Sequence, residues 1–163
     1  MPPDFLHPER EIKKHGDKLP HWQQDEALQF VTFRLGDALP LARIRRWREQ
    51  HYTWMQTHPK PWDAATEKEY HRKFTWILED WLDEGIGSCL LGDSSARVYL
   101  SETLVRFQGE RVLHQAWVIM PNHVHPLFKP LAPIEKLIQA WKSHSAARIG
   151  KGPIWQRNYR DTM

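Results

Sequence analysis

Two histidines separated by one residue, His123 and His125, are the side chains in this sequence best spaced to do chemistry. In a β-strand, residues i and i+2 project from the same face, so both imidazoles can reach one point above the sheet. Imidazole is a common ligand of divalent metal ions. A solvated strand surface would show the same spacing, so the pattern alone leaves both interpretations open.

Histidine-triad nucleotide hydrolases also carry alternating histidines on a strand, and they are the competing enzyme class for this motif. Their pattern needs a third histidine two residues after the second one. This chain has Leu127 at that position, so we exclude the class.

The strands and helices that the sequence predicts around the histidine pair indicate an α+β domain. Alternating aromatic and β-branched residues predict strands over residues 28–35, 111–120, 123–129 and 154–159. Apolar residues every three to four positions predict helices over residues 40–57, 63–84, 93–108 and 133–149. This order predicts a ferredoxin-like antiparallel sheet with helices on one side and a helical insertion after the first strand, at about residues 40–90.

Length and composition limit the organisation and the location of the chain. At 163 residues it is the size of one domain, 1–163, with a proline-bearing and charged N-terminal arm over residues 1–20. The mean hydropathy is −0.68, and the sequence contains neither a long apolar run nor an apolar signal core. We therefore expect no membrane span and no secretion. A single cysteine, Cys89, fits a cytoplasmic location. The net charge of +3 permits a nucleic-acid partner without requiring one.

Several motifs in order along the chain resemble the REP-associated tyrosine transposases, whose domain is of the HUH (His-hydrophobe-His) type. Residues 116–125, Ala-Trp-Val-Ile-Met-Pro-Asn-His-Val-His, look like the strand, turn and histidine pair of that family. Similar matches are Leu-Pro-His-Trp at 19–22, Phe-Val-Thr-Phe-Arg-Leu at 30–35, Trp-Lys-Ser at 141–143, and Trp-Gln-Arg-Asn-Tyr at 155–159 with Asp161. The resemblance covers the chain from about residue 15.

The resemblance implies metal-assisted cleavage and transfer of DNA strands in the full-length family. His123 and His125 are then the metal ligands, and they hold Mg²⁺ or Mn²⁺, which polarises a scissile phosphate of single-stranded or hairpin DNA. A tyrosine hydroxyl attacks the phosphorus, giving a 5′-phosphotyrosine and a free 3′-hydroxyl. With two ligands the ion is weakly held, and the same imidazoles also suit Zn²⁺ and Ni²⁺.

The chain departs from the family pattern in two places. The nucleophilic tyrosine of the family lies on a helix beyond the last matched strand, and the sequence stops at Met163. We therefore assign no catalytic residue; either the chain is truncated or Tyr159 has been recruited, and we expect weak DNA binding without a covalent adduct. The alternative function is a non-catalytic DNA-binding module. The second departure is Pro126, which lacks an N–H and is expected to interrupt strand pairing just after the second histidine.

Basic and aromatic residues near the C-terminus are the candidate DNA contacts. They are Lys142, Arg148, Lys151, Trp155, Arg157 and Arg160. Lysine and arginine neutralise phosphates, and aromatic rings stack on unpaired bases. Trp141 and the aromatic stripe of residues 63–84 are expected to be core instead. Because family members often work as dimers, the resemblance also allows a homodimer.

Overall fold

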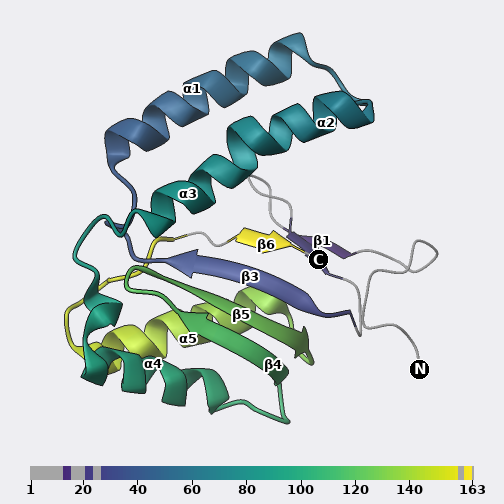
Figure 1. Cartoon of the computed structure of the whole chain (residues 1–163). Coiled ribbons are helices and arrows are strands. Elements are labelled where there is room, and N and C mark those ends of the chain that lie inside the picture. The colour runs from purple at the N-terminus through teal and green to yellow at the C-terminus, as the bar shows by residue number, and fades with distance from the viewer. Residues whose placement is uncertain (1–12, 16–20, 24–26, 158–159, 163) are drawn as a thin grey trace. The chain divides into compact units, whose positions relative to one another are not determined.

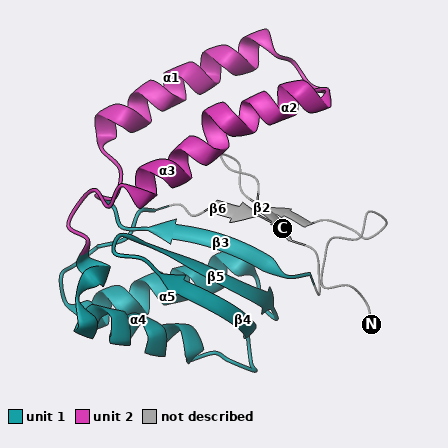
Figure 2. Ribbon diagram, in the orientation of Figure 1, with its two compact units in different colours: residues 1–36, 90–163 teal, residues 37–89 magenta. Residues whose placement is uncertain are grey.

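The computed structural model describes residues 13–15, 21–23, 27–157 and 160–162, with side chains described between residues 27 and 157. The chain divides into two compact units (Figure 2). One unit joins residues 1–36 to residues 90–163, and the other comprises Asp37–Cys89. Within the described ranges, no helix combines the length and the apolar character that crossing a lipid bilayer requires.

Four strands of the first unit form an antiparallel sheet. Across the sheet the order is β4 (Val112–Ile119), β5 (His123–Pro130), β3 (Gln29–Arg34) and β6 (Arg160–Thr162). Since β5 pairs antiparallel with both β3 and β4, these two strands run parallel to each other on either side of it. This is the split arrangement of a ferredoxin-like sheet, so the predicted α+β fold class is confirmed.

Helices α4 (Ser94–Val105) and α5 (Ile134–Ile149) cover one face of this sheet (Figure 1). Asp93 caps α4, because its Oδ1 accepts a hydrogen bond from the backbone N–H of Ala96 at 2.9 Å. Gly150 ends α5 in the left-handed conformation, at a φ of 73°. Both helix boundaries agree with the sequence prediction.

The core of the first unit lies between the sheet and these two helices. Val31, Phe33 and Leu35 alternate along the chain and are buried, as the strand pattern predicts. Trp141 of α5 is 0% exposed, and its ring centroid lies 5.2 Å from that of Phe128 and 6.4 Å from that of Phe33. The prediction that Trp141 belongs to the core is confirmed.

The two ends of the chain differ from the sequence prediction in their strands. Strand β1 (Lys13–His15) pairs antiparallel with β2 (His21–Gln23), so part of the predicted extended arm is a short hairpin. Residues 1–12 and 16–20 of the arm lie outside the described residues.

The predicted strand over residues 154–159 is not a regular strand in its described part, residues 154–157, and residues 158–159 lie outside the described residues. Trp155 makes only an isolated bridge to Leu35, and β6 starts at Arg160. The indole N–H of Trp155 donates to Ser145 Oγ at 2.9 Å, and its ring meets Phe33 edge-on at 4.9 Å. We attribute the difference to this packing, which draws the Trp155 side chain onto α5.

The second unit is a helical hairpin, and it is the predicted insertion after the first strand. Helix α1 (Leu41–Thr57) forms one arm. The other arm is continuous: α2 (Ala64–Tyr70), a π-helix (His71–Trp76) and α3 (Ile77–Asp83). The sequence predicts this arm as a plain α-helix, because periodicity does not register the single extra residue of a π-turn.

Aromatic side chains hold the two arms of the hairpin together. Trp54 of α1 is buried, with its ring centroid 5.7 Å from Phe74 and 5.4 Å from Tyr70 on the other arm. His51 and Trp47, one and two turns earlier on α1, also meet Phe74 edge-on. The prediction that the stripe of residues 63–84 is core rather than a binding face is confirmed at Phe74, its buried member.

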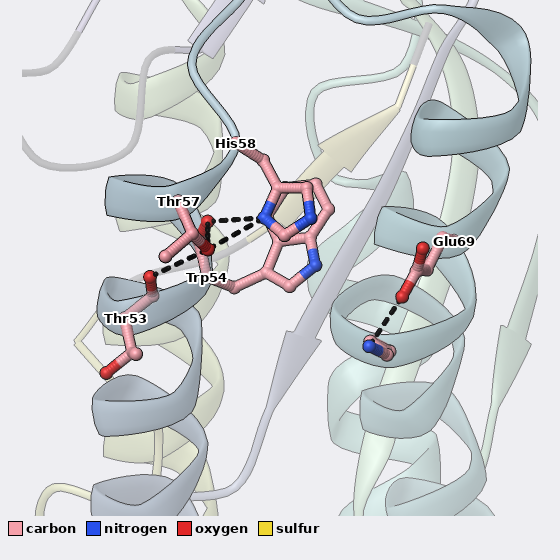
Figure 3. A network of polar contacts seen from close by, with 6 residues as sticks. Thr53, Trp54, Thr57, His58 and Glu69 are labelled. Carbon is pink, nitrogen blue, oxygen red and sulfur yellow. Dashed lines mark hydrogen bonds and ion pairs between the residues drawn. The ribbon is translucent and has the colours of Figure 1, made fainter.

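Side-chain hydrogen bonds close the C-terminal end of α1 (Figure 3). Thr57 Oγ1 donates to the carbonyl oxygens of Thr53 at 3.3 Å and Trp54 at 3.0 Å. The His58 ring stacks on Trp54, with centroids 4.1 Å apart and planes 5° apart. The carbonyl oxygen of Trp54 also accepts from the backbone N–H of His58 at 3.0 Å, so the side-chain bonds add to the last turn of the helix. Pro59, which has no N–H, cannot continue the helical pattern beyond it.

The two ends of the Asp37–Cys89 unit are fastened to each other. The backbone N–H of Ser88 donates to Asp37 Oδ2 at 2.7 Å. Gly87 adopts a φ of 99°, and a Cβ at this position would lie 2.6 Å from the carbonyl oxygen of Asp37. Only glycine allows this approach without displacing the backbone.

Gly87→Ala is expected to destabilise the Asp37–Cys89 unit by ~1–3 kcal/mol more than Gly85→Ala does. Gly85 also has a positive φ, 65°, but a Cβ there meets nothing within 4 Å. The control therefore carries backbone strain alone, and the difference isolates the contact with Asp37. Hydrogen exchange of the α1–α3 amides measures both losses. Equal losses would show that the close approach relaxes at no cost.

Candidate functional site

Strand β5 places His123 and His125 side by side on one face of the sheet. Their ring centroids are 4.5 Å apart, and the ring planes cross at 83°. His123 is 1% exposed, whereas His125 is half-buried. Val124 between them is buried on the opposite face. The relative placement of the two imidazoles is therefore the one that the i, i+2 spacing predicts.

Each histidine has its Nδ1 atom in a side-chain hydrogen bond. The Nδ1–H of His123 donates to Asn122 Oδ1 at 2.7 Å. A hydrogen bond of 2.9 Å joins His125 Nδ1 to Thr32 Oγ1 on β3. Such partners fix the orientation of an imidazole, as they do for histidines around bound metals. The sequence analysis missed Thr32 and Asn122, although alternation puts Thr32 on the face of β3 opposite Val31 and Phe33, and the turn puts Asn122 beside His123.

Pro126 interrupts the pairing of β5 with β3 next to the second histidine. The paired positions Phe33–Val124 and Phe30–Leu127 leave a gap at His125 and Pro126. On the other side of β5 the pairing with β4 continues through Pro126. Proline has no N–H to donate, which accounts for the one-sided gap. The predicted interruption is confirmed, and the bond between Thr32 and His125 lies within it.

Two exposed apolar side chains flank His125 on the neighbouring strands. Phe30 of β3 is 41% exposed and stacks on the His125 ring, with centroids 5.3 Å apart and planes 10° apart. Val118 of β4 is the register partner of His125 and is also exposed. The sequence analysis placed Phe30 in the strand but gave it no functional role. The ring of Phe30 gives the site a flat, accessible face.

The residues present fit a weak metal site. Within the part of the chain that the structure describes, no group of three or more His, Cys, Asp or Glu side chains is arranged to hold a metal ion. The hydrogen bond from His123 Nδ1–H leaves the ring lone pair on Nε2, the form that binds a metal. His123 and His125 suit a divalent ion with water in the remaining positions. Binding of Mg²⁺ or Mn²⁺ stays a prediction.

The predicted DNA-contacting residues have different surroundings. Lys151 and Arg157 are exposed. Arg148 pairs with Glu102 and lies 4.7 Å from the centroid of the Tyr99 ring. Trp155 packs on Phe33 and bonds Ser145, as described above, and the side chain of Arg160 lies outside the description. The six contacts to DNA stay predictions; among the side chains that the structure describes, those of Arg148, Lys151 and Arg157 are exposed.

Lys142 has a structural role that the sequence analysis missed. Its Nζ donates to the carbonyl oxygens of Gln156 at 2.7 Å and Arg157 at 3.3 Å, so it ties α5 to the segment before β6. Burial, and secondarily the positive charge of Arg34, lower the pKa of Lys142 from 10.5 to about 8. The sequence does not reveal this burial, because every residue type offers the backbone carbonyl oxygen that accepts the bond.

A scan against protein-family models finds no match for this chain. A search of curated proteins finds no match either. Among solved structures, the chain is similar to a REP-associated tyrosine transposase bound to a REP hairpin, with a TM-score of 0.42 and 12% identity over 97% of this chain and 61% of that one. The chain thus spans less than two thirds of the length of that protein. At this TM-score and identity, the likeness assigns neither a family nor a function.

Proposed function

We propose that the protein binds single-stranded or hairpin-forming DNA at the face of its sheet that carries the histidine pair, with Mg²⁺ or Mn²⁺ held by His123 and His125. The observation that carries the proposal is the adjacency of the two imidazoles, with ring centroids 4.5 Å apart and each Nδ1 held by a hydrogen bond. The order of motifs along the sequence supports the same function. A divalent ion bound there supplies Lewis-acid polarisation of a phosphate oxygen.

The protein's own side chains have separate tasks in this proposal. Thr32 and Asn122 orient the two imidazoles through their Nδ1 atoms. The exposed ring of Phe30 offers a stacking surface to an unpaired base beside His125. Lys151 and Arg157, both exposed, neutralise phosphates.

The sequence resemblance extends the proposal to strand cleavage and transfer through a phosphotyrosine, with a non-catalytic DNA-binding module as the alternative. Incubation with a labelled single strand and Mn²⁺, followed by denaturing electrophoresis, separates the two. A covalent protein–DNA band that Tyr159→Phe removes would assign the nucleophile to Tyr159. Hairpin binding without such a band supports the binding module for this chain.

His125→Gln is expected to weaken Mn²⁺ binding at least about tenfold, because it replaces one of two imidazole ligands. Titration of Mn²⁺ followed by electron paramagnetic resonance measures this loss directly, without DNA. The same variant is expected to lose the gain in affinity that Mn²⁺ gives for a palindromic hairpin over a random single strand. A gel shift with and without EDTA measures that gain.

His144→Gln is the matched control for this experiment. His144 is a half-buried histidine on α5, and its ring contacts Phe107 instead of the histidine pair. It is expected to bind Mn²⁺ and the hairpin as the wild type does. Mn²⁺ binding that survives His125→Gln, or hairpin binding that EDTA leaves unchanged, contradicts the proposal.

A further inference from the structure

We propose that one face of α1 in the Asp37–Cys89 unit is a second nucleic-acid site, which binds single strands without a metal. Four residues, Leu41, Arg45, Arg48 and Tyr52, form this face, the α1 outer row. They follow the spacing i, i+4, i+7 and i+11, which aligns side chains along one side of a helix. The site does not involve the histidine pair.

The α1 outer row is exposed, and the packing of the hairpin does not use it. Leu41 is 69% and Tyr52 68% exposed, and Arg45 and Arg48 are also exposed. The aromatic side chains that α1 turns toward the other arm, with Trp54 at their centre, lie on a different side of the helix. The row is therefore available to a partner.

The arginines of the row stand where the helix itself disfavours them. Arg43 forms an ion pair with Glu84 at 2.6 Å, but across the described residues neither Arg45 nor Arg48 has an ion-pair partner. The first turn of α1 contains no acidic residue. Like charges three residues apart oppose helix stability. A bound polyanion relieves this repulsion between Arg45 and Arg48.

Tyr52 narrows the class of polyanion to a single-stranded nucleic acid. Arginine binds phosphates along a strand, and an exposed aromatic ring next to it stacks on a base whose face is free. A duplex hides those faces within its base stack. A helix that lies on an anionic membrane needs a broad apolar face. The row offers only Leu41 and Tyr52 as apolar surface, so it does not fit a membrane.

The test uses the full chain in EDTA, with a fluorescent single-stranded oligonucleotide of mixed sequence. Arg45→Gln/Arg48→Gln is expected to reduce the slope of log affinity against log salt by about 1.4, since each phosphate contact to a single strand contributes about 0.7. Tyr52→Ala is expected to bind about tenfold more weakly, and Tyr52→Phe to bind as the wild type does. Fluorescence anisotropy gives all three values.

Arg46→Gln/Arg72→Gln is the matched control, because both arginines are exposed in the same unit and lie outside the row. It removes the same net charge and is expected to change the slope by less than half as much. Circular dichroism checks that each variant is folded. Equal slopes for the two double variants, or wild-type binding by Tyr52→Ala, overturn the proposal.

Binding to phosphatidylserine vesicles tests the alternative that the row contacts an anionic membrane. Vesicle binding that depends on Arg45 and Arg48, with oligonucleotide binding unchanged, would assign the row to a membrane surface and overturn the proposal. His125→Gln is expected to bind the oligonucleotide normally in EDTA. Failure of the α1 outer row therefore leaves the histidine site untouched, and failure of the histidine site leaves this test intact.

Discussion

Trp141→Ala is expected to lower the free energy of unfolding by about 3–5 kcal/mol, the usual loss for truncating a fully buried tryptophan. The Trp141 side chain is 0% exposed and fills the space between α5 and the sheet, against Phe33 and Phe128. Alanine leaves a cavity there, and the surrounding strands can close it only in part. Urea unfolding followed by circular dichroism measures the loss.

Two further variants bracket this result. Trp141→Phe keeps an aromatic ring in the core and is expected to lose less than half as much. Val98→Ala truncates a side chain on α4 that is 52% exposed, and is expected to change stability by no more than ~0.5 kcal/mol. A loss at Trp141 as small as the one at Val98 would contradict the packing described for the core.

Between about pH 8 and pH 10.5, the stability of the wild type relative to Lys142→Met is expected to rise with pH. The pKa of Lys142 is lowered from 10.5 to about 8 in the folded protein, because the ammonium group is buried. In this window the unfolded chain therefore binds the extra proton, and unfolding becomes less favourable as pH increases. The rise amounts to at most about 3 kcal/mol, taking 1.36 kcal/mol for each unit of pKa.

Urea unfolding at a series of pH values measures this difference. Lys142→Met has no charge to bury and is expected to lose the slope. Lys136→Met changes an exposed lysine of the same helix and is expected to keep it. If the slope persists in Lys142→Met, another group causes it, and the burial of Lys142 does not carry the energy assigned to it.

Local sequence patterns were sufficient for most of the sheet and its helices. The alternation of Val31, Phe33 and Leu35 identifies a strand and its buried face, and Asp93 and Gly150 mark helix ends by their own backbone chemistry. The same holds for His123 and His125, because the geometry of a strand fixes their relative placement. These features depend on neighbours a few residues away.

The features that sequence patterns missed depend on contacts between distant residues. Thr32 and His125 are 93 positions apart, so no local period can pair them. Lys142 has the spacing of a solvent-facing helix residue, but its partners are carbonyl groups 14 and 15 positions later. Trp155 has the residue type of a strand, yet it makes only an isolated bridge to Leu35, and its indole bonds to Ser145 of α5.

The hydrogen bond between Asp37 and Ser88 has a consequence for the order in which the chain folds. Strand β3 must pair with β5 across residues 35–122, and closing a loop of that length costs about 4 kcal/mol of chain entropy. The helical hairpin is built from contacts close in sequence, so it can form early. Once it does, its fastened ends take the Asp37–Cys89 unit out of that loop and leave a shorter one, which contains α4 and β4. A shorter loop costs less entropy to close, so early formation of the insertion is expected to accelerate the pairing of β3 with β5.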